Sequence, residues 1–329
     1  MKPASPSIGV AAPLVRRIGD WIAKTQRGQG RLCVLNYHRI LETPDPLLAA
    51  EPDIAAFRWQ MQVLADCFNV LPMDRALAAL ADGSLPPRAV CITFDDGYRS
   101  IHDLALPVLR EFGFPATVFV TTGFVDQGSM WNDRILEALR TTEAKRVDLA
   151  EAGLGSYSLS TLDDRRHAIA ALTEKAKYMA PQLRQALVER LDTLAGRPDR
   201  EPMLTRDMIR ALARHDIDIG AHTVSHPILT SLDDDHARTE IADGKRELEA
   251  ILGQPVRYFA YPNGKEGKDF DARHTAMARE AGFEAAFTTA IGASTASQDR
   301  YRLPRSRPWD RTPLMFSLRL LRWLSGRVA

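Results

Sequence analysis

Two adjacent carboxylates are the most specific chemical feature of the sequence. Asp95 and Asp96 end a continuously apolar run and are followed by Gly97 and Tyr98. Neighbouring side chains on a strand point to opposite faces, so both carboxylates can reach one site only where the strand ends. Gly97 permits the tight turn that this requires. A helix N-cap with a surface acid would account for one aspartate but not for two, so the pair predicts a catalytic site.

A pair of histidines supplies the ligands that a metal site would need. His222 and His226 follow another β-like run, and on a helical turn this spacing places both imidazoles on one face. Two imidazoles and Asp96 form a three-ligand set with open positions, as in catalytic zinc sites. We expect a divalent metal, zinc first, although cobalt and nickel also suit these ligands. Such an ion acidifies water and polarises a carbonyl, which leaves Asp95 as the base.

A third histidine, His38, ends the first β-like run. Hydrolysis of an amide or ester needs an acid that protonates the leaving group, and His38 is the candidate. Taken alone, this residue is explained as well by a structural role. Its position at a strand end, shared with the two motifs above, favours the role of acid.

Strand-like and helix-like segments alternate along the chain. Runs typical of strands buried on both faces lie at 32–38, 68–71, 90–95, 116–122, 217–223, 256–261 and 285–289. Helices are expected at 57–66, 74–81, 101–112, 235–252 and 270–281. This alternation indicates βαβ units and an α/β fold, and seven strands favour a barrel over an open sheet. Barrel enzymes keep their chemistry at the carboxyl ends of the strands, where all the candidate residues fall.

Residues 126–202 interrupt the alternation. They contain helical stretches at 133–139, 162–178 and 181–194 and no convincing strand, which predicts a helical insertion after the fourth strand. Loops at this end of a barrel line the active site, so the insertion is a candidate lid or substrate wall. Trp131 is either a sugar-stacking residue or a packing anchor, and packing is the more common role.

Composition limits the cellular setting. The chain has 329 residues, 45% hydrophobic and 26% charged, and its three cysteines form no CxxC pair. Sparse cysteines argue against a disulfide framework and favour a reducing compartment. Residues 1–13 do not resemble a signal peptide, and no apolar run reaches the ~18 residues of a membrane span. We expect a cytoplasmic protein without a signal peptide or transmembrane helix.

Basic amphipathic segments flank an acidic body. Residues 1–31 hold six Lys or Arg and one Asp, and residues 302–329 hold seven Arg and one Asp, although the net charge is only +1. Either flank could make a peripheral contact with the inner membrane face, or dock on the barrel exterior. An acidic body without a basic-aromatic module argues against nucleic acid as a partner.

The expected organisation therefore has three parts. Residues 1–30 form a basic amphipathic segment, and residues 306–329 form a basic amphipathic helix. Between them, residues 31–305 form the barrel, interrupted by the helical insertion.

Residues 93–97, Thr-Phe-Asp-Asp-Gly, and 222–226, His-Thr-Val-Ser-His, resemble the first two motifs of the polysaccharide deacetylases. These are the NodB-homology enzymes of carbohydrate esterase family four. The resemblance implies a distorted (β/α)7 barrel, a divalent metal that is usually zinc, and removal of an acyl group from an amino sugar. It also implies Asp95 as base, with Asp96 and both histidines as metal ligands.

The third motif departs from the family pattern. Residues 259–264, Phe-Ala-Tyr-Pro-Asn-Gly, stand where many members have Arg-x-Pro-Tyr-Gly, so Ala260 replaces the arginine that braces the catalytic aspartate. Arg305 is the candidate substitute. The proline and glycine are retained, so we expect the turn that places an oxyanion donor at Asn263 to persist. The candidate substrate and oxyanion residues are Asn263, Tyr261, Arg305, Tyr98 and Trp131.

Two other family segments differ. The Asp-x-x-Asp-Trp segment is not evident, and the late Leu-x-His motif is missing because no histidine follows His274. Residues 35–38, Leu-Asn-Tyr-His, are similar to an early segment of the circularly permuted members, such as deacetylases of poly-N-acetylglucosamine. In those members the early histidine is the general acid, which implies this role for His38.

These features predict a metal-dependent hydrolase that removes an N-acyl group, N-acetyl first, from an amino sugar in a polysaccharide or its lipid-linked precursor. One alternative is a metallohydrolase that acts on a non-sugar amide or ester. Another is a catalytically inactive glycan-binding module, supported only by the changed third motif.

Overall fold

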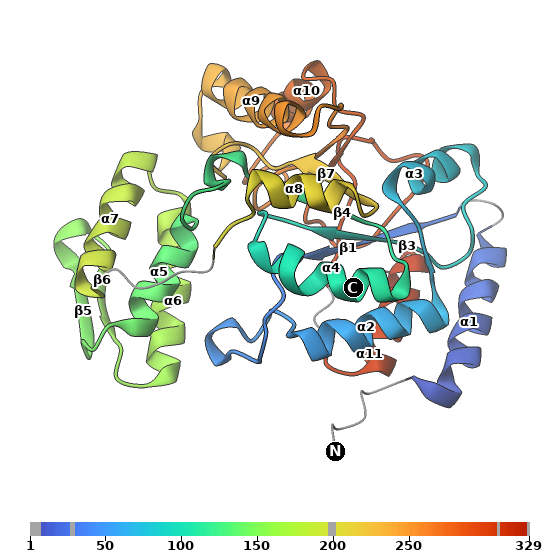
Figure 1. Ribbon diagram of the computed structural model, residues 1–329, viewed down its shortest axis with the longest axis horizontal. Helices are drawn as coiled ribbons and strands as arrows, with labels where there is room; N and C mark the ends of the chain where they lie inside the picture. Colours follow the sequence, from blue (N-terminus) through green and yellow to red (C-terminus); the bar gives the residue numbers. More distant parts are fainter. Residues whose placement is uncertain (1–7, 27–29, 197–201, 308–309, 328–329) are drawn as a thin grey trace.

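A curled, mostly parallel sheet forms the centre of the molecule (Figure 1). The computed structural model describes residues 8–26, 30–196, 202–307 and 310–327. Within these residues the strands of the sheet are β1 (Leu32–Tyr37), β2 (Asn69–Val70), β3 (Ala89–Phe94), β4 (Ala116–Val120), β7 (Ile217–Ala221), β8 (Tyr258–Ala260), β9 (Ala285–Phe287) and β10 (Ala293–Ser294). Their order is β10–β1–β3–β4–β7–β8–β9, with β2 beside the start of β3, and only the β1–β10 pair is antiparallel. Each predicted strand overlaps one of the parallel strands, which confirms the distorted (β/α)7 barrel.

Helices cover the outside of this sheet. They are α1 (Ala12–Thr25), α2 (Ile54–Cys67), α3 (Met73–Asp82), α4 (Leu106–Phe112), α8 (Arg206–Ala213), α9 (Asp234–Leu252), α10 (Ala272–Glu280) and α11 (Pro313–Leu324). The predicted helix at 101–112 begins as a π-helical turn, η3 (Ile101–Ala105), before α4 continues it. The helix α8 is one that the sequence patterns did not predict.

Alternation along the strands separates the barrel interior from the helix-facing layer. One buried cluster holds the interior side chains Leu32, Val34, Ala89, Cys91, Phe119, Tyr258, Ala260 and Phe287. Their sequence neighbours pack instead against the helices. Because this alternation has a period of two, the interior series runs on past the strand ends to His38, Asp95 and His222.

An extended segment, residues 303–306, closes the barrel between β9 and β1. Leu303 bridges to Phe287 of β9, and Ser306 bridges to Leu35 of β1. The amide of Leu303 donates to the Ala286 carbonyl at 3.0 Å, and the amide of Ser306 donates to the carbonyl of β1 residue Val34 at 2.9 Å. Arg305 consequently sits in the closing segment, with its side chain buried in the interior.

The insertion forms a small unit beside the barrel (Figure 1). It contains α5 (Trp131–Thr141), β5 (Arg146–Leu149), β6 (Gly155–Ser158), α6 (Leu162–Lys177) and α7 (Pro181–Leu194) around a core of its own. The expectation that it holds no strand is wrong, because β5 and β6 pair as an antiparallel hairpin. Val147 and Leu149 of β5 face the core while their neighbours are exposed, so the strand is amphipathic but only four residues long.

Both terminal helices dock on the barrel exterior. The helices α1 and α11 pack against each other and against α2, and a Cβ at Gly19 would lie 3.1 Å from Leu321. Of the two alternatives expected for the flanks, membrane contact or docking on the barrel, the structure therefore shows docking for the buried side of each helix. No helix in the described residues has the length and apolarity to cross a membrane.

Candidate functional site

The carboxyl ends of the parallel strands meet around one cavity of about 690 Å3. Its walls include the predicted residues His38, Asp95, Asp96, Tyr98, His222, His226, Asn263 and Arg305. The insertion contributes part of the wall through Asn132, Asp133, Leu136, Ile169 and Thr173. The location matches the face where barrel enzymes place their sites.

Arg305 braces Asp95 by a paired contact inside the barrel. Two guanidinium nitrogens donate to the two carboxylate oxygens at 2.5 and 2.8 Å, and both side chains are almost fully buried. Burial raises the pKa of Asp95, but the charge and hydrogen bond of Arg305, together with His222 and His38, outweigh burial and hold the pKa below its ordinary value. Arg305 also donates to Thr93 Oγ1 at 3.3 Å. The closing segment therefore supplies the arginine that the third motif lacks.

Asp96, His222 and His226 form a cluster that fits a metal ion. The Oδ1 atom of Asp96 lies 3.5 Å from Nε2 of each histidine, and this buried oxygen has no hydrogen-bond partner in the described structure. Ligand atoms about 2.1 Å from one tetrahedral ion lie about 3.4 Å apart, so the observed spacing suits such an ion. Asp96 belongs to the helix-facing series by its position, and its φ of 73° turns it back into the site.

Hydrogen bonds, burial and nearby charges set the protonation states of His222 and His226. Nδ1 of His222 lies 2.7 Å from the Ala260 carbonyl, so it carries the proton and Nε2 is free for a metal. Burial favours neutral His222, but Asp95 and Asp96 outweigh it and raise the pKa. Burial lowers the pKa of His226 to about 3, so this ring is neutral near pH 7.

A carboxylate of α9 holds the loop that carries His226. Glu240 accepts hydrogen bonds from the backbone amides of Val224 and Ser225 at 2.9 and 2.8 Å, and from the Ser225 hydroxyl at 2.6 Å. The loop needs this support because Thr223 and His226 both have positive φ, which non-glycine residues adopt at a cost in energy. Sequence reasoning missed Glu240, since it is one of several acids on a charged helix.

His38 faces the cavity, whose wall also includes Asn36 and Arg307. Its Nδ1 atom is shielded from solvent and has no hydrogen-bond partner in the described residues. Burial and then the Arg307 charge lower the pKa of His38, while Arg307 itself pairs with Glu51 at 2.6 Å. Asn36, two residues earlier on the same face of β1, is buried with both amide atoms unpartnered in the described structure. Sequence reasoning did not single out Asn36, although strand alternation could have done so.

Asn263 lies at a tight turn after β8. Its φ is 60° and that of Gly264 is 67°, and its carbonyl accepts from Thr289 Oγ1 at 2.6 Å. A Cβ at Gly264 would come within 2.8 Å of the Thr289 amide nitrogen, so the close approach requires glycine. The turn expected from the retained proline and glycine is present.

Tyr98 lines the cavity but is held by its neighbours. Arg39 lies over the ring at 3.9 Å and donates to the hydroxyl oxygen, and the hydroxyl donates to Asp133 at 3.0 Å. Arg39 also forms a buried ion pair with Asp133 of α5. This cluster joins the barrel to the insertion, and sequence reasoning missed both charged partners.

Two predicted substrate residues lie outside the cavity wall. Tyr261 follows the interior residue Ala260, so alternation turns it to the helix side, where it stacks on Phe270 and donates to the Tyr301 carbonyl at 3.0 Å. Trp131 is buried in the core of the insertion, with Arg184 over its ring at 4.9 Å. Trp131 therefore has the position of a packing residue and not that of a sugar-stacking residue in the cavity wall.

Comparison with known sequences identifies related proteins. A sequence model described as polysaccharide deacetylase matches residues 82–286. YxkH of Bacillus subtilis strain 168, which is named for the polysaccharide deacetylases, is 22% identical over 288 residues, 87% of this chain and 74% of the relative. A poly-beta-1,6-N-acetyl-D-glucosamine N-deacetylase of Staphylococcus epidermidis is 30% identical over 143 residues, 39% of this chain and 47% of the relative.

Solved structures share the fold. The Streptococcus pyogenes deacetylase PplD, solved in complex with acetate, superposes with a TM-score of 0.60 at 20% identity and covers 90% of this chain and 99% of its own. IcaB from Ammonifex degensii has a TM-score of 0.59 at 20% identity, covering 90% of this chain and 97% of its own. At this level of identity the likeness establishes the barrel architecture.

Proposed function

The chain belongs to the polysaccharide deacetylase family, and from this membership we propose that it hydrolyses the N-acetyl group of an amino sugar in a glycan. The observation that carries the proposal is a single cavity in which Asp96, His222 and His226 can hold a cation next to Asp95. Polymers of N-acetylglucosamine are the first substrates to test, because the Staphylococcus epidermidis relative is named for one.

Zinc is the cation that we propose for the cluster, because two imidazoles and one carboxylate are a common catalytic zinc set. When bound, it supplies Lewis acidity, which lowers the pKa of water and polarises the acyl carbonyl. His222 is oriented for this role by the Ala260 carbonyl, and His226 by the loop that Glu240 holds.

Asp95 is the proposed general base. Its lowered pKa keeps the carboxylate ionised at neutral pH, and Arg305 fixes its orientation. The carboxylate removes a proton from the attacking water as the new C–O bond forms. The backbone at Asn263 is the proposed donor to the developing oxyanion, and the unpartnered amide of Asn36 is available to the sugar or acyl group.

His38 is the proposed acid for the departing nitrogen. Its lowered pKa means that the ring begins neutral, so it first accepts a proton from solvent water and then delivers it as the C–N bond breaks, while Asp95 returns to solvent the proton that it took from the attacking water. The products are acetate and the free amino sugar. The likeness to the circularly permuted members stays a prediction.

Acetate release tests this proposal directly. Purified protein, stripped of metal and restored with zinc, is incubated with β-1,6-linked N-acetylglucosamine oligomers. We expect zinc-dependent acetate release, reduced about 10²- to 10⁴-fold in Asp95→Asn, because the general base is lost. Zinc binding, measured by calorimetry, should persist in Asp95→Asn and fall sharply in His226→Ala.

The control is Asp163→Asn, because this aspartate is 86% exposed in the insertion and should not affect turnover. Unchanged acetate release from Asp95→Asn would exclude the proposed base. Zinc-bound wild-type protein that releases no acetate from sugars but hydrolyses other amides would favour the non-sugar metallohydrolase.

A further inference from the structure

The outward side of α11 carries an uncovered apolar stripe. Leu314, Met315 and Leu318 are 49%, 52% and 43% exposed, although the opposite side of the helix is buried against the barrel. These three residues, which we call the α11 stripe, lie on adjacent turns of one helical face. Large apolar side chains gathered on one exposed face are typical of a contact surface.

Three cations lie close to the α11 stripe in sequence. Arg311, Arg322 and Arg327 are exposed and form no ion pair in the part of the chain that the structure describes. The acid nearest in sequence, Asp310, is already engaged by Arg319 at 2.9 Å. The surface therefore combines apolar side chains with net positive charge.

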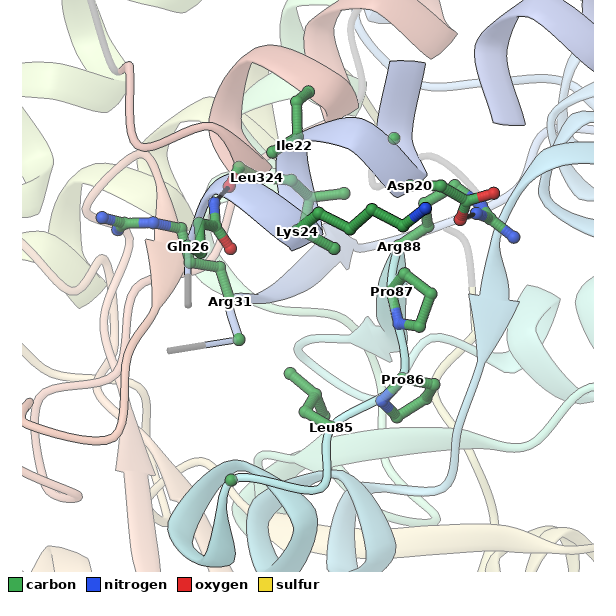
Figure 2. A pocket seen from close by; sticks show the side chains of 14 residues that line it. Asp20, Ile22, Lys24, Gln26, Arg31, Leu85, Pro86, Pro87, Arg88 and Leu324 are labelled. Carbon is green, nitrogen blue, oxygen red and sulfur yellow. Dashed lines mark hydrogen bonds and ion pairs between the residues drawn. The ribbon is translucent and has the colours of Figure 1, made fainter. Parts of the chain in front are cut away.

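The adjacent helix α1 repeats this composition. Trp21 is 66% exposed, and Leu14 is 59% exposed on the same helical face as Arg17 and Lys24. The one acid of α1, Asp20, turns to Arg88 at the edge of a second cavity, between α1 and the loop before β3 (Figure 2). Two helices in contact thus present exposed apolar side chains, a tryptophan and cations that pair with no acid among the residues described.

The α11 stripe is continuous with the functional site. Arg319 and Trp323, on the flank of α11, line the same cavity as His38 and Asp96. Arg319 directly follows Leu318 and lies one turn after Met315. A planar partner that covered the α11 stripe would therefore lie beside the mouth of this cavity.

We propose that the α11 stripe rests on an anionic phospholipid bilayer and holds the mouth of the site cavity at the lipid surface. Apolar side chains enter the boundary between headgroups and acyl chains, tryptophan favours this interface, and arginines attract anionic headgroups. The contact implies that the amino sugar is presented from a membrane. That implication rests on the proposed function, whereas the contact itself does not.

Vesicle cosedimentation of the full chain tests the contact. We expect binding to phosphatidylglycerol-containing vesicles and weak binding to phosphatidylcholine alone, because the cations need anionic headgroups. The triple variant Leu314→Glu, Met315→Glu and Leu318→Glu should bind at least about tenfold more weakly. Combined Arg311→Gln and Arg322→Gln should weaken binding to the anionic vesicles by about 30-fold, at roughly 1 kcal/mol for each arginine.

The matched control is Leu183→Glu with Leu194→Glu on α7, which removes exposed leucines of the insertion and should not change binding. Failure of the wild type to bind anionic vesicles, or equal binding by the triple variant, would overturn the proposal. So would a dimer that depends on the α11 stripe without vesicle binding. Acetate release from soluble oligomers, measured on the same samples, should survive in every stripe variant. Vesicle binding without any acetate release would instead count against the proposed function alone.

Discussion

Arg305 is the buried cation beside Asp95, the proposed base. Replacing Arg305 by Gln leaves a buried carboxylate without its cation, and this should raise the pKa of Asp95. The base works only when ionised, so the acidic limb of the kcat/KM profile should move to higher pH. Loss of one partner of a buried pair should also destabilise the fold by about 3–5 kcal/mol, measured by urea unfolding.

Arg302→Gln is the control for this substitution. Arg302 lies three residues earlier and pairs with Glu266 at a site that is partly exposed. Arg302→Gln should change the pH profile of kcat/KM and the free energy of unfolding only slightly. An acidic limb that stays in place in Arg305→Gln would show that Arg305 does not set the ionisation of Asp95.

The sequence predicted which residues lie together in one cavity where chemistry restricts the residue type. Asp95, Asp96, His222, His226 and His38 were identified because few other roles explain acids and imidazoles at strand ends, and the structure brings them together. Tyr261 was wrongly expected at the substrate site. The exact end of β8 determines whether the next side chain faces the cavity or the helices, and the sequence pattern does not define this end. Glu240 could not be found, since its contact with residues 224–225 depends on helix packing rather than on a motif.

At the scale of elements, α9 and the histidine loop act together. Glu240→Gln keeps the shape of the side chain but removes the charge that accepts two backbone amides and a hydroxyl. The loop should then hold His226 less firmly, and zinc affinity should fall by about 10- to 100-fold in calorimetric titration. The matched substitution Glu247→Gln, at an exposed position of the same helix, should have no effect. Equal zinc affinity in both variants would argue against support from α9.

The parallel strands of the barrel were predictable, and the hairpin of the insertion and the irregular closing segment were not. The strands of the barrel follow from continuous apolarity, because both of their faces are buried. The hairpin of β5 and β6 is too short for its alternation to stand out from chance. The closing segment 303–306 contains a proline and little β-propensity, so its place between β9 and β1 follows only from the finished barrel.

At the scale of the whole molecule, the buried Arg39–Asp133 ion pair couples the insertion to the barrel. Asp133→Ala removes the partner of Arg39 and the acceptor of Tyr98, and leaves a buried cation. Stability should fall by about 3–5 kcal/mol in urea unfolding. KM for the glycan should rise more than kcat falls, because α5 forms part of the cavity wall. Glu174→Ala breaks an exposed pair with Lys268 across the same boundary and should cost less than about 1 kcal/mol. Similar losses in the two variants would contradict a special role for the buried pair.

During translation, the two partners of the Asp95–Arg305 pair emerge at very different times. They are 210 residues apart in sequence, and Arg305 lies in the segment that joins the last parallel strand to the first. A nascent chain that has emerged only as far as His226 holds every proposed metal ligand, yet its Asp95 still lacks the neighbouring cation. Synthesis therefore delivers the proposed metal ligands first and the cation beside the proposed base last, so the ribosome must pass the closing segment before the Asp95–Arg305 pair can form.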